Sequence, residues 1–169
     1  MRRAPGWTLV ELILVIVVVG TLAIFVGPLV LRAISAYDLT EGTVATYAKM
    51  RYAMARLARE VREVRRSPAD AANLDISSMA PANFTFVKAD GQQVAVTSAG
   101  STVTLDYVGT ASGTLTDQVS AFALAYYQQD GTTAATDAGN VALVQISLTL
   151  ADGGNNFPNR LRIDLRNPQ

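Results

Sequence analysis

The most restrictive feature of this sequence is a long apolar run near its N-terminus. Residues 9–31 read LVELILVIVVVGTLAIFVGPLVL, and the 20 residues from Leu12 to Leu31 carry no charged side chain. Twenty helical residues rise about 30 Å, which is the thickness of the hydrocarbon core of a bilayer. A buried helix of a small soluble domain rarely needs so long an uncharged run. The sequence therefore predicts a membrane-spanning helix.

The residues that flank the run predict its orientation in the membrane and whether it is cleaved from the mature protein. Arg2 and Arg3 precede it, so the positive-inside rule keeps the N-terminus cytoplasmic and exports the C-terminal part of the chain, with Arg32 opposing this weakly. The run is longer than the roughly 7–15 apolar residues of a cleaved secretory signal. The nearest small-x-small sequence after it lies at 33–35 and is a poor cleavage site. We therefore expect the helix to stay on the mature protein.

Glu11 places one carboxylate inside the apolar run. A charge at the centre of a membrane helix costs about 2.5–3.5 kcal/mol on insertion scales and less near an interface, so such residues are usually retained for a partner. One interpretation is that Glu11 merely lies at the level of the lipid headgroups. The other is that residues 3–11, RAPGWTLVE, form a signal for processing and assembly.

The second interpretation is favoured by a family resemblance. A basic leader ending in Gly6, then an aromatic residue, Thr-Leu-Val-Glu and an apolar helix resemble the class III signal of type IV pilins and type II secretion pseudopilins. The resemblance implies that prepilin peptidase cleaves between Gly6 and Trp7 on the cytoplasmic side and that Trp7 is then N-methylated. Glu11 becomes the fifth mature residue, the family's invariant acidic position, and Pro28 matches its proline at mature position 22. One departure is Trp7, where phenylalanine is usual.

Glu11 is interpreted as an assembly residue. Cleavage would expose a positively charged amine at Trp7, one helical turn from the Glu11 carboxylate. In a low-dielectric helix bundle the two charges attract far more strongly than in water, and leaving either unpaired is expensive. A neighbouring subunit whose Glu11 accepts this amine would fix the axial register of a filament.

Gly20, Gly27 and Pro28 weaken the helix within the run. Pro28 lacks an amide hydrogen and its ring crowds the carbonyl of Ile24, so the helix is predicted to kink or loosen there. The glycines lower helix propensity but permit close approach of neighbouring helices. The resemblance implies local melting in this region, and the alternative is an ordinary proline kink in a membrane anchor.

Beyond the anchor, helical periodicity predicts an amphipathic helix over residues 36–67. The expected apolar stripe comprises Val44, Tyr47, Met54, Leu57, Val61 and Val64, and the opposite face comprises Lys49, Arg56, Arg59, Glu60, Glu63 and Arg66. The helix should end near Ser67-Pro68, because the residue before proline is disfavoured in the helical region.

Six arginines in this segment raise the alternative of DNA binding, which the family resemblance allows for some minor pilins: Arg51, Arg56, Arg59, Arg62, Arg65 and Arg66. Arg56 and Glu60 are one turn apart, as are Arg59 and Glu63, so several charges can be paired locally. No aromatic residues interleave the arginines at a stacking spacing. We expect a solvated, partly paired face and no nucleic-acid partner.

Residues 68–169 are predicted to form an antiparallel sheet. The clearest signal is a hairpin in which 84–88 and 93–97 flank Asp90-Gly91, and further strands are expected at 102–108, 119–128, 141–150 and 160–165. The predicted fold is α+β: a leader (1–6), a transmembrane helix (7–35) that continues as the amphipathic helix (36–67), and a sheet packed on it in a pilin-like ladle shape. The strands and the C-terminal 162–167 resemble heads of minor pilins of the PilW, MshO and GspJ type.

Composition excludes most catalytic chemistry. The chain has no Cys and no His, which removes thiol nucleophiles, disulfides, histidine bases and metal sites that need nitrogen or sulfur ligands. Its 14 basic and 14 acidic side chains give no basic excess for phosphate neutralisation. Neither a phosphate-binding loop nor a nucleophile elbow occurs. We expect that the protein is not an enzyme and uses no cofactor.

Two turn-rich loops carry oxygen ligands that could hold calcium if the loops were neighbours. They contain Asp130, Asp137 and Asn140 in one case and Asp152, Asn155 and Asn156 in the other. Neither has the spacing of an EF-hand, and Asp-Gly and Gly-Asn pairs are first of all turn formers. We therefore expect no metal site and regard these residues as weak candidates.

Two hypotheses of different classes remain. In the first, the chain is a minor pilin or pseudopilin whose partners are prepilin peptidase, other pilin subunits and the bacterial inner membrane. Its N-terminus would be cytoplasmic and its head periplasmic before assembly into a filament. In the second, it is an anchored periplasmic binding module whose head captures DNA, a surface or an export substrate.

Overall fold

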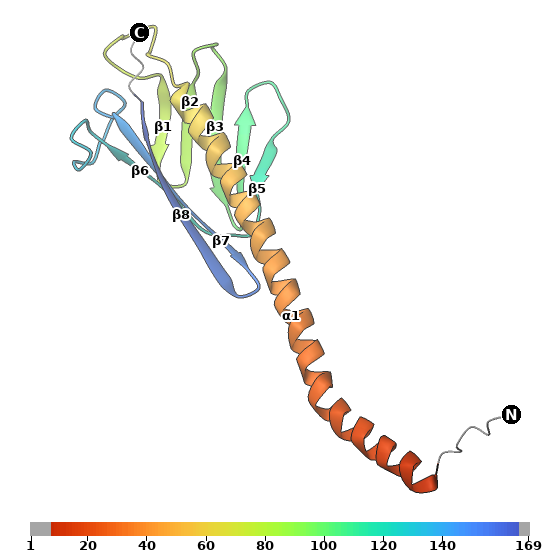
Figure 1. Cartoon of the computed structure of the whole chain (residues 1–169). Helices are drawn as coiled ribbons and strands as arrows, with labels where there is room; N and C mark the ends of the chain where they lie inside the picture. The colour runs from red at the N-terminus through yellow and green to blue at the C-terminus, as the bar shows by residue number, and fades with distance from the viewer. Residues whose placement is uncertain (1–7, 166–169) are drawn as a thin grey trace, which may run out of the picture. The chain divides into compact units, whose positions relative to one another are not determined.

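The computed structural model describes the backbone of residues 8–165 and the side chains of all of these except 36–41. The predicted leader and the cleavage and methylation positions Gly6 and Trp7 lie outside the described residues. The chain divides into two compact units, Met1–Gly42 and Thr43–Gln169. Helix α1 (Leu9–Arg62) is followed by antiparallel strands, so the α+β class predicted from the sequence is confirmed (Figure 1).

In the first unit, α1 has the length and composition of a membrane span. Its segment Leu9–Ser35 has 27 residues with a mean hydropathy of 3.0, and none of its most apolar window is buried inside the protein. The hydroxyls of Thr21 and Ser35 donate to the carbonyls of Val18 and Leu31 at 2.9 and 3.0 Å. Both hydroxyls thereby find a hydrogen-bond acceptor on their own helix, so they need no water in a lipid environment.

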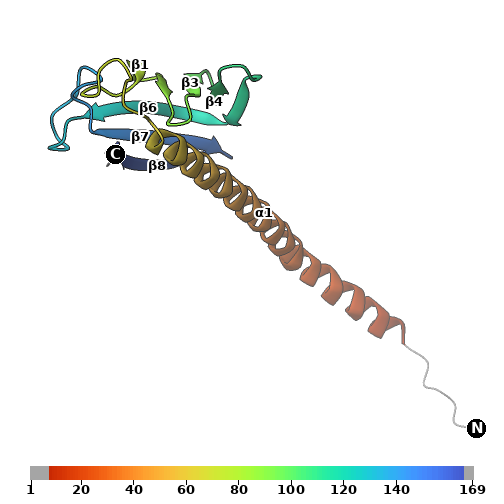
Figure 2. The ribbon, with the colours of Figure 1, turned by 90° about the horizontal axis from the view of Figure 1, so that it is seen from above.

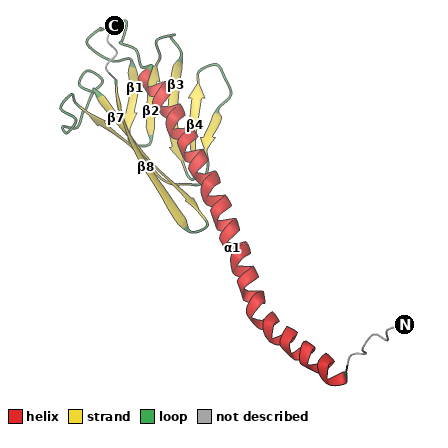
Figure 3. Ribbon diagram, in the orientation of Figure 1, coloured by secondary structure: helices red, strands yellow, loops and turns green. Residues whose placement is uncertain are grey.

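The second unit contains two antiparallel sheets (yellow in Figure 3). The first has five strands in sequence order: β1 (Ile76–Ala80), β2 (Asn83–Val87), β3 (Gln93–Ala99), β4 (Thr102–Tyr107) and β5 (Gly113–Thr116). The second has three: β6 (Val119–Tyr127), β7 (Leu143–Asp152) and β8 (Asn155–Asp164). Viewed from above, β6, β7 and β8 lie side by side (Figure 2).

Each sheet buries one face, because alternate side chains of a strand point to opposite sides. Phe84 and Phe86 of β2 are fully buried, as are Val144 and Ile146 of β7. The two sheets meet where β6 runs past the β1–β2 turn, and there the amide of Leu124 donates to the carbonyl of Pro81 at 2.8 Å. The apolar faces of the sheets and one side of the helix segment 43–62 therefore share a single core.

The buried stripe of α1 in this unit differs from the predicted one at its start. Three predicted members are buried within α1, namely Met54, Leu57 and Val61, and Val64 is buried just beyond the end of the helix. Val44 and Tyr47 are 63% and 54% exposed, so the prediction is wrong for them. Thr46 and Met50 are buried instead, and the Thr46 hydroxyl donates to Asp152 at the end of β7. In this turn of α1, the residues that are buried are those that face the end of β7, whether or not they are apolar.

Helix α1 ends at Arg62, five residues before the predicted end at Ser67-Pro68. The chain becomes extended after Glu63 because it pairs with the sheet: Val64 forms a bridge with Lys88, and the amide of Arg65 donates to the carbonyl of Val87 at 3.0 Å. These backbone groups gain tertiary partners and no longer need helical ones. Pro68 therefore follows the helix end and does not cause it.

The predicted hairpin between β2 and β3 is confirmed, with Gly91 in the left-handed region at φ 86°. The prediction of one sheet is wrong, because the chain passes from the first sheet to the second between β5 and β6. Only Asp117 and Gln118 separate these strands, and Gln118 has a φ of 59° at the junction. Strands β1 and β5 were not predicted. They are short, and their sequences ISSMA and GTLT show no clear alternation, so pairing with β2 and β4 determines them.

The strand predicted at 160–165 begins earlier, at Asn155. Residues 155–159, with three asparagines and Pro158, have low strand propensity. They are nevertheless paired along β7, and Pro158 is tolerated because β8 lies at the edge of its sheet.

Candidate functional site

The predicted assembly residue Glu11 is exposed in the first turn of α1. Thr8 caps this turn: its side-chain oxygen accepts a hydrogen bond from the amide of Glu11 at 3.3 Å. Within the described part of the chain, no ion pair reaches the Glu11 carboxylate. The amine predicted at Trp7 lies outside the described residues, so the proposed pairing stays a prediction.

Gly20, Gly27 and Pro28 all lie within the continuous helix α1. A Cβ added at either glycine would meet no atom within 4 Å, so neither residue is required by packing within this chain. Their absence of side chains leaves room for a neighbouring helix. The predicted kink or local melting at Pro28 stays a prediction.

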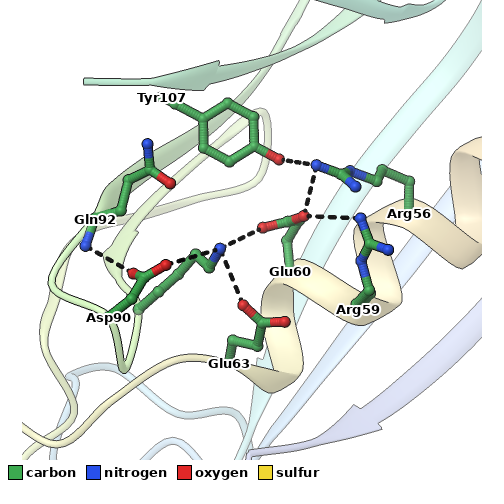
Figure 4. A network of polar contacts seen from close by, with 8 residues as sticks. Arg56, Arg59, Glu60, Glu63, Asp90, Gln92 and Tyr107 are labelled. Atoms are coloured by element: carbon green, nitrogen blue, oxygen red, sulfur yellow. Dashed lines mark hydrogen bonds and ion pairs between the residues drawn. The ribbon is translucent and has the colours of Figure 1, made fainter. Parts of the chain in front are cut away.

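The second unit contains a buried polar site around Glu60, a residue that the helical pattern places on the solvated face. Glu60, predicted on the solvated face, is only 2% exposed. Its Oε1 lies 3.0 Å from Nη2 of Arg56 and 3.7 Å from Nη2 of Arg59, and its Oε2 lies 3.3 Å from Nζ of Lys88 (Figure 4). No hydrogen bond of good geometry reaches Oε2. A buried carboxylate is expensive unless paired, and here cations from two elements pair it.

Lys88 connects this carboxylate to the β2–β3 turn. Its Nζ lies 3.0 Å from Glu63 and 3.5 Å from Asp90, in addition to the contact with Glu60. The hydrogen bond with Glu63 is the main cause that raises the pKa of Lys88 above its ordinary value of 10.5. The amide of Gln92 donates to Asp90 and lowers the pKa of that carboxyl. One ammonium therefore ties the end of α1 to the turn after β2.

Tyr107 brings a third element to the same place. Its hydroxyl accepts a hydrogen bond from Nη2 of Arg56 at 2.5 Å, and this bond is the main cause that raises the pKa of Arg56. Burial raises the pKa of the Tyr107 hydroxyl. The Glu60 network, comprising Arg56, Arg59, Glu60, Glu63, Lys88, Asp90 and Tyr107, thus joins α1 to the ends of β2 and β4 (Figure 4). It is suited to holding these elements in register.

One signal in the sequence could have located this network. Glu60 precedes Val61 and follows Leu57 by three residues, so a buried stripe through both apolar residues passes close to Glu60. The predicted pair of Arg56 and Glu60 is confirmed. The predicted pair of Arg59 and Glu63 is not found: Arg59 contacts Glu60, and Glu63 contacts Lys88.

A second polar cluster surrounds Gln118. Lys49 of α1 donates to Asp117 at 2.8 Å and to the side-chain oxygen of Gln118 at 3.1 Å. The side-chain amide of Gln118 lies 3.5 Å from Asp152, which also accepts the hydroxyl of Thr46. These contacts fix the strained junction between the two sheets to the helix.

The weak calcium candidates form turns. Asp130 accepts the amides of Thr132 and Thr133, and Asp137 accepts the amides of Gly139 and Asn140.

The two loops predicted to hold them lie before and after the ten-residue strand β7, so they do not converge. Asp152 at the end of β7 is therefore remote from Asp130 and Asp137. Among the side chains that the structure describes, no three acidic groups gather in a metal-binding arrangement.

The arginines predicted on one basic face have different surroundings. Arg65 pairs with Asp75 at 2.8 Å, and Arg66 donates to the carbonyl of Ala71 at 2.9 Å. Arg51 and Arg62 are exposed on α1. The expected partial pairing is confirmed, and the cations are spread over several elements.

No protein-family model matches this sequence, and no curated protein matches it significantly. Function is therefore inferred from the residues and contacts described above.

The Glu60 network predicts a large difference between two neighbouring carboxylates. Glu60→Ala removes the anion shared by the nearly buried Lys88 and the half-buried Arg56, and should lower the free energy of unfolding by about 3 kcal/mol, the lower end for a broken buried pair, because Lys88 keeps Glu63 and Asp90. The control Glu63→Ala removes a carboxylate that is 44% exposed and should cost less than about 1 kcal/mol. Denaturant unfolding of both variants of the full chain in detergent measures the difference. Equal losses would contradict the central role of Glu60.

Lys88 also predicts a loss of stability at alkaline pH. Its pKa is raised on folding, so its contribution is complete below its ordinary value of 10.5 and falls as pH rises above that value. Melting temperature should therefore decline more steeply above this pH in the native chain than in Lys88→Arg, whose guanidinium stays charged. Parallel declines in the two proteins would show that Lys88 is not the responsible group.

Proposed function

We propose that this chain is a minor pilin or pseudopilin, a structural subunit of a type IV pilus or a type II secretion pseudopilus. The observation that carries the proposal is an N-terminal helix of membrane-spanning length with one carboxylate, Glu11, inside its first turn. The helix belongs to a chain whose second unit is an α+β head. The spacing of Gly6, Trp7, Glu11 and Pro28 in the sequence supports the same conclusion.

This spacing supports a proposed order of insertion, processing and assembly. The chain inserts in the bacterial inner membrane as a single span with its N-terminus cytoplasmic and its head periplasmic. Prepilin peptidase removes residues 1–6 and Trp7 is methylated. The apolar helix, none of whose membrane-length window is buried by its own protein, is then covered by the helices of other subunits in a filament. Glu11 sets the register of that packing.

An anchored periplasmic binding module is the alternative. The exposed Arg51 and Arg62 on α1 would be available to an anionic partner in that case. The two functions differ in their N-terminus, because only the filament subunit requires cleavage. The intact mass of protein purified from membranes distinguishes a chain that begins at Trp7 from one that retains residues 1–6.

Cleavage predicts that Gly6→Ala accumulates as the full-length precursor. A side chain at this position would obstruct the peptidase, whereas the nearby control Ala4→Ser should be processed normally. Intact mass spectrometry of membrane extracts should show the loss of residues 1–6 and the gain of one methyl group in the control only. Normal processing and assembly of Gly6→Ala would refute the proposal.

Assembly predicts a different defect for Glu11→Ala. The variant should still lose its leader, because the cleavage position is intact, but it should be absent from sheared filaments, because the charge that sets the register is gone. The control Leu12→Ala changes a neighbour that is also exposed, at 54%, and should assemble. Immunoblots of membrane and filament fractions measure both steps. Normal incorporation of Glu11→Ala would show that the carboxylate does not direct assembly.

A further inference from the structure

The edges of the two sheets differ in how they are covered. The edge of β6 is partly occupied, because the amide of Leu124 donates to the carbonyl of Pro81. Strand β8 carries Pro158 and two arginines at its edge. Strand β5, at one end of the five-stranded sheet, has the sequence GTLT with no proline and no charge (Figure 1). It therefore lacks the residues that commonly block an edge.

The backbone of β5 is incompletely paired. Two successive residues of β4, Thr104 and Val103, pair with Thr114 and Thr116 of β5. The intervening Leu115 therefore has no opposite residue on β4. Within the described chain, no backbone hydrogen bond from outside the sheet reaches β5. An added strand could pair with its outward N–H and C=O groups, which have only water as an alternative partner.

A depression of about 260 Å³ lies between this edge and α1. It is lined by Lys49 and Tyr52 of the helix and by residues 114–117. Tyr52 is 66% exposed, and it makes no hydrogen bond or ring contact within the described part of the chain. Leu115 is half-buried against the core and lines the same depression. Tyr52 and Leu115 thus leave an apolar surface directly beside the free edge.

We propose that the β5 edge binds an extended segment of another protein as an added strand, with one large apolar side chain of that segment in the depression beside Tyr52. Side chains of a strand alternate between the two faces of a sheet, so every second residue of the added strand would point toward α1. The backbone of β5 would supply affinity, and the depression would supply selectivity. This binding concerns the second unit and does not depend on the proposed filament function.

The chemistry of the surface defines the segment that fits it. Lys49 and Asp117 line the depression but pair with each other at 2.8 Å, so they compensate each other's charge. A short edge suits one short extended segment and does not favour extensive association of sheets. The long edge β8 of a second copy would bring Pro158, Arg160 and Arg162, which suit neither strand pairing nor an apolar depression. The expected partner is therefore an uncharged, extended segment of a different chain.

A synthetic peptide tests the edge directly. The probe is Lys-Thr-Ser-Thr-Phe-Thr-Ser-Thr-Lys with blocked ends, which reads the same in both directions and can therefore pair in either strand orientation. Titration of the full chain in detergent, followed by fluorescence anisotropy of the labelled probe, should show saturable binding. Replacing phenylalanine by alanine should weaken binding at least about tenfold, because the apolar contact is lost. A probe that is N-methylated along its central part lacks the amide hydrogens of a strand and should not bind.

Two variants of α1 separate the depression from the rest of the helix surface. Tyr52→Ala should weaken binding of the probe at least about fivefold, because it removes the aromatic wall of the depression. The control Arg51→Ala changes an exposed neighbour outside the depression and should leave binding unchanged. Hydrogen exchange supplies the location: the probe should slow exchange of the amides of residues 113–116 and leave those of β8 unaffected.

Several results would overturn the inference. These are the absence of saturable binding, equally tight binding of the N-methylated probe, unchanged binding by Tyr52→Ala, and slowed exchange in β8 in place of β5. Self-association of the native chain that Tyr52→Ala abolishes and the probe displaces would identify a second copy as the occupant, and the assignment to a different chain would then be wrong.

Discussion

The two halves of helix α1 need different surroundings to cover their apolar side chains, and the rest of the structure depends on this difference. Residues 9–35 of α1 are apolar and nothing in their own unit covers them, so they need lipid or other helices. Residues 46–61 of the same helix carry buried side chains such as Met50 and Leu57, which need the two sheets. The hydrophobic effect is satisfied locally in the second unit and only by association in the first.

The sequence predicted those parts that depend on local patterns. The apolar span, the α+β class and the hairpin around Gly91 follow from composition, periodicity and turn chemistry. The helical pattern places Glu60 close to the buried stripe but could not identify the groups around it, because Lys88 and Tyr107 come from distant parts of the chain. For the same reason the early end of α1 was missed: strand pairing after Arg62 outweighed the local proline signal.

The Glu60 network and the Glu11 charge illustrate two uses of a carboxylate in an apolar setting. Glu60 finds Arg56 and Lys88 within its own unit, so its cost is offset when that unit folds. Glu11 finds no cation among the described residues, and its cost is offset only if another molecule supplies one. In the proposed filament, the first carboxylate serves folding and the second serves association.

Strand β8 is an edge strand, and its sequence affects whether other chains can pair with it. It is a ten-residue edge strand, and an exposed edge of this length is a template on which other chains can add as strands and aggregate. Pro158 cannot donate a hydrogen bond from its nitrogen, and Arg160 and Arg162 place positive charges along the strand. Proline and charged side chains on an edge strand oppose the addition of a strand from another molecule. In the proposed filament, contacts between subunits would therefore fall to the helices.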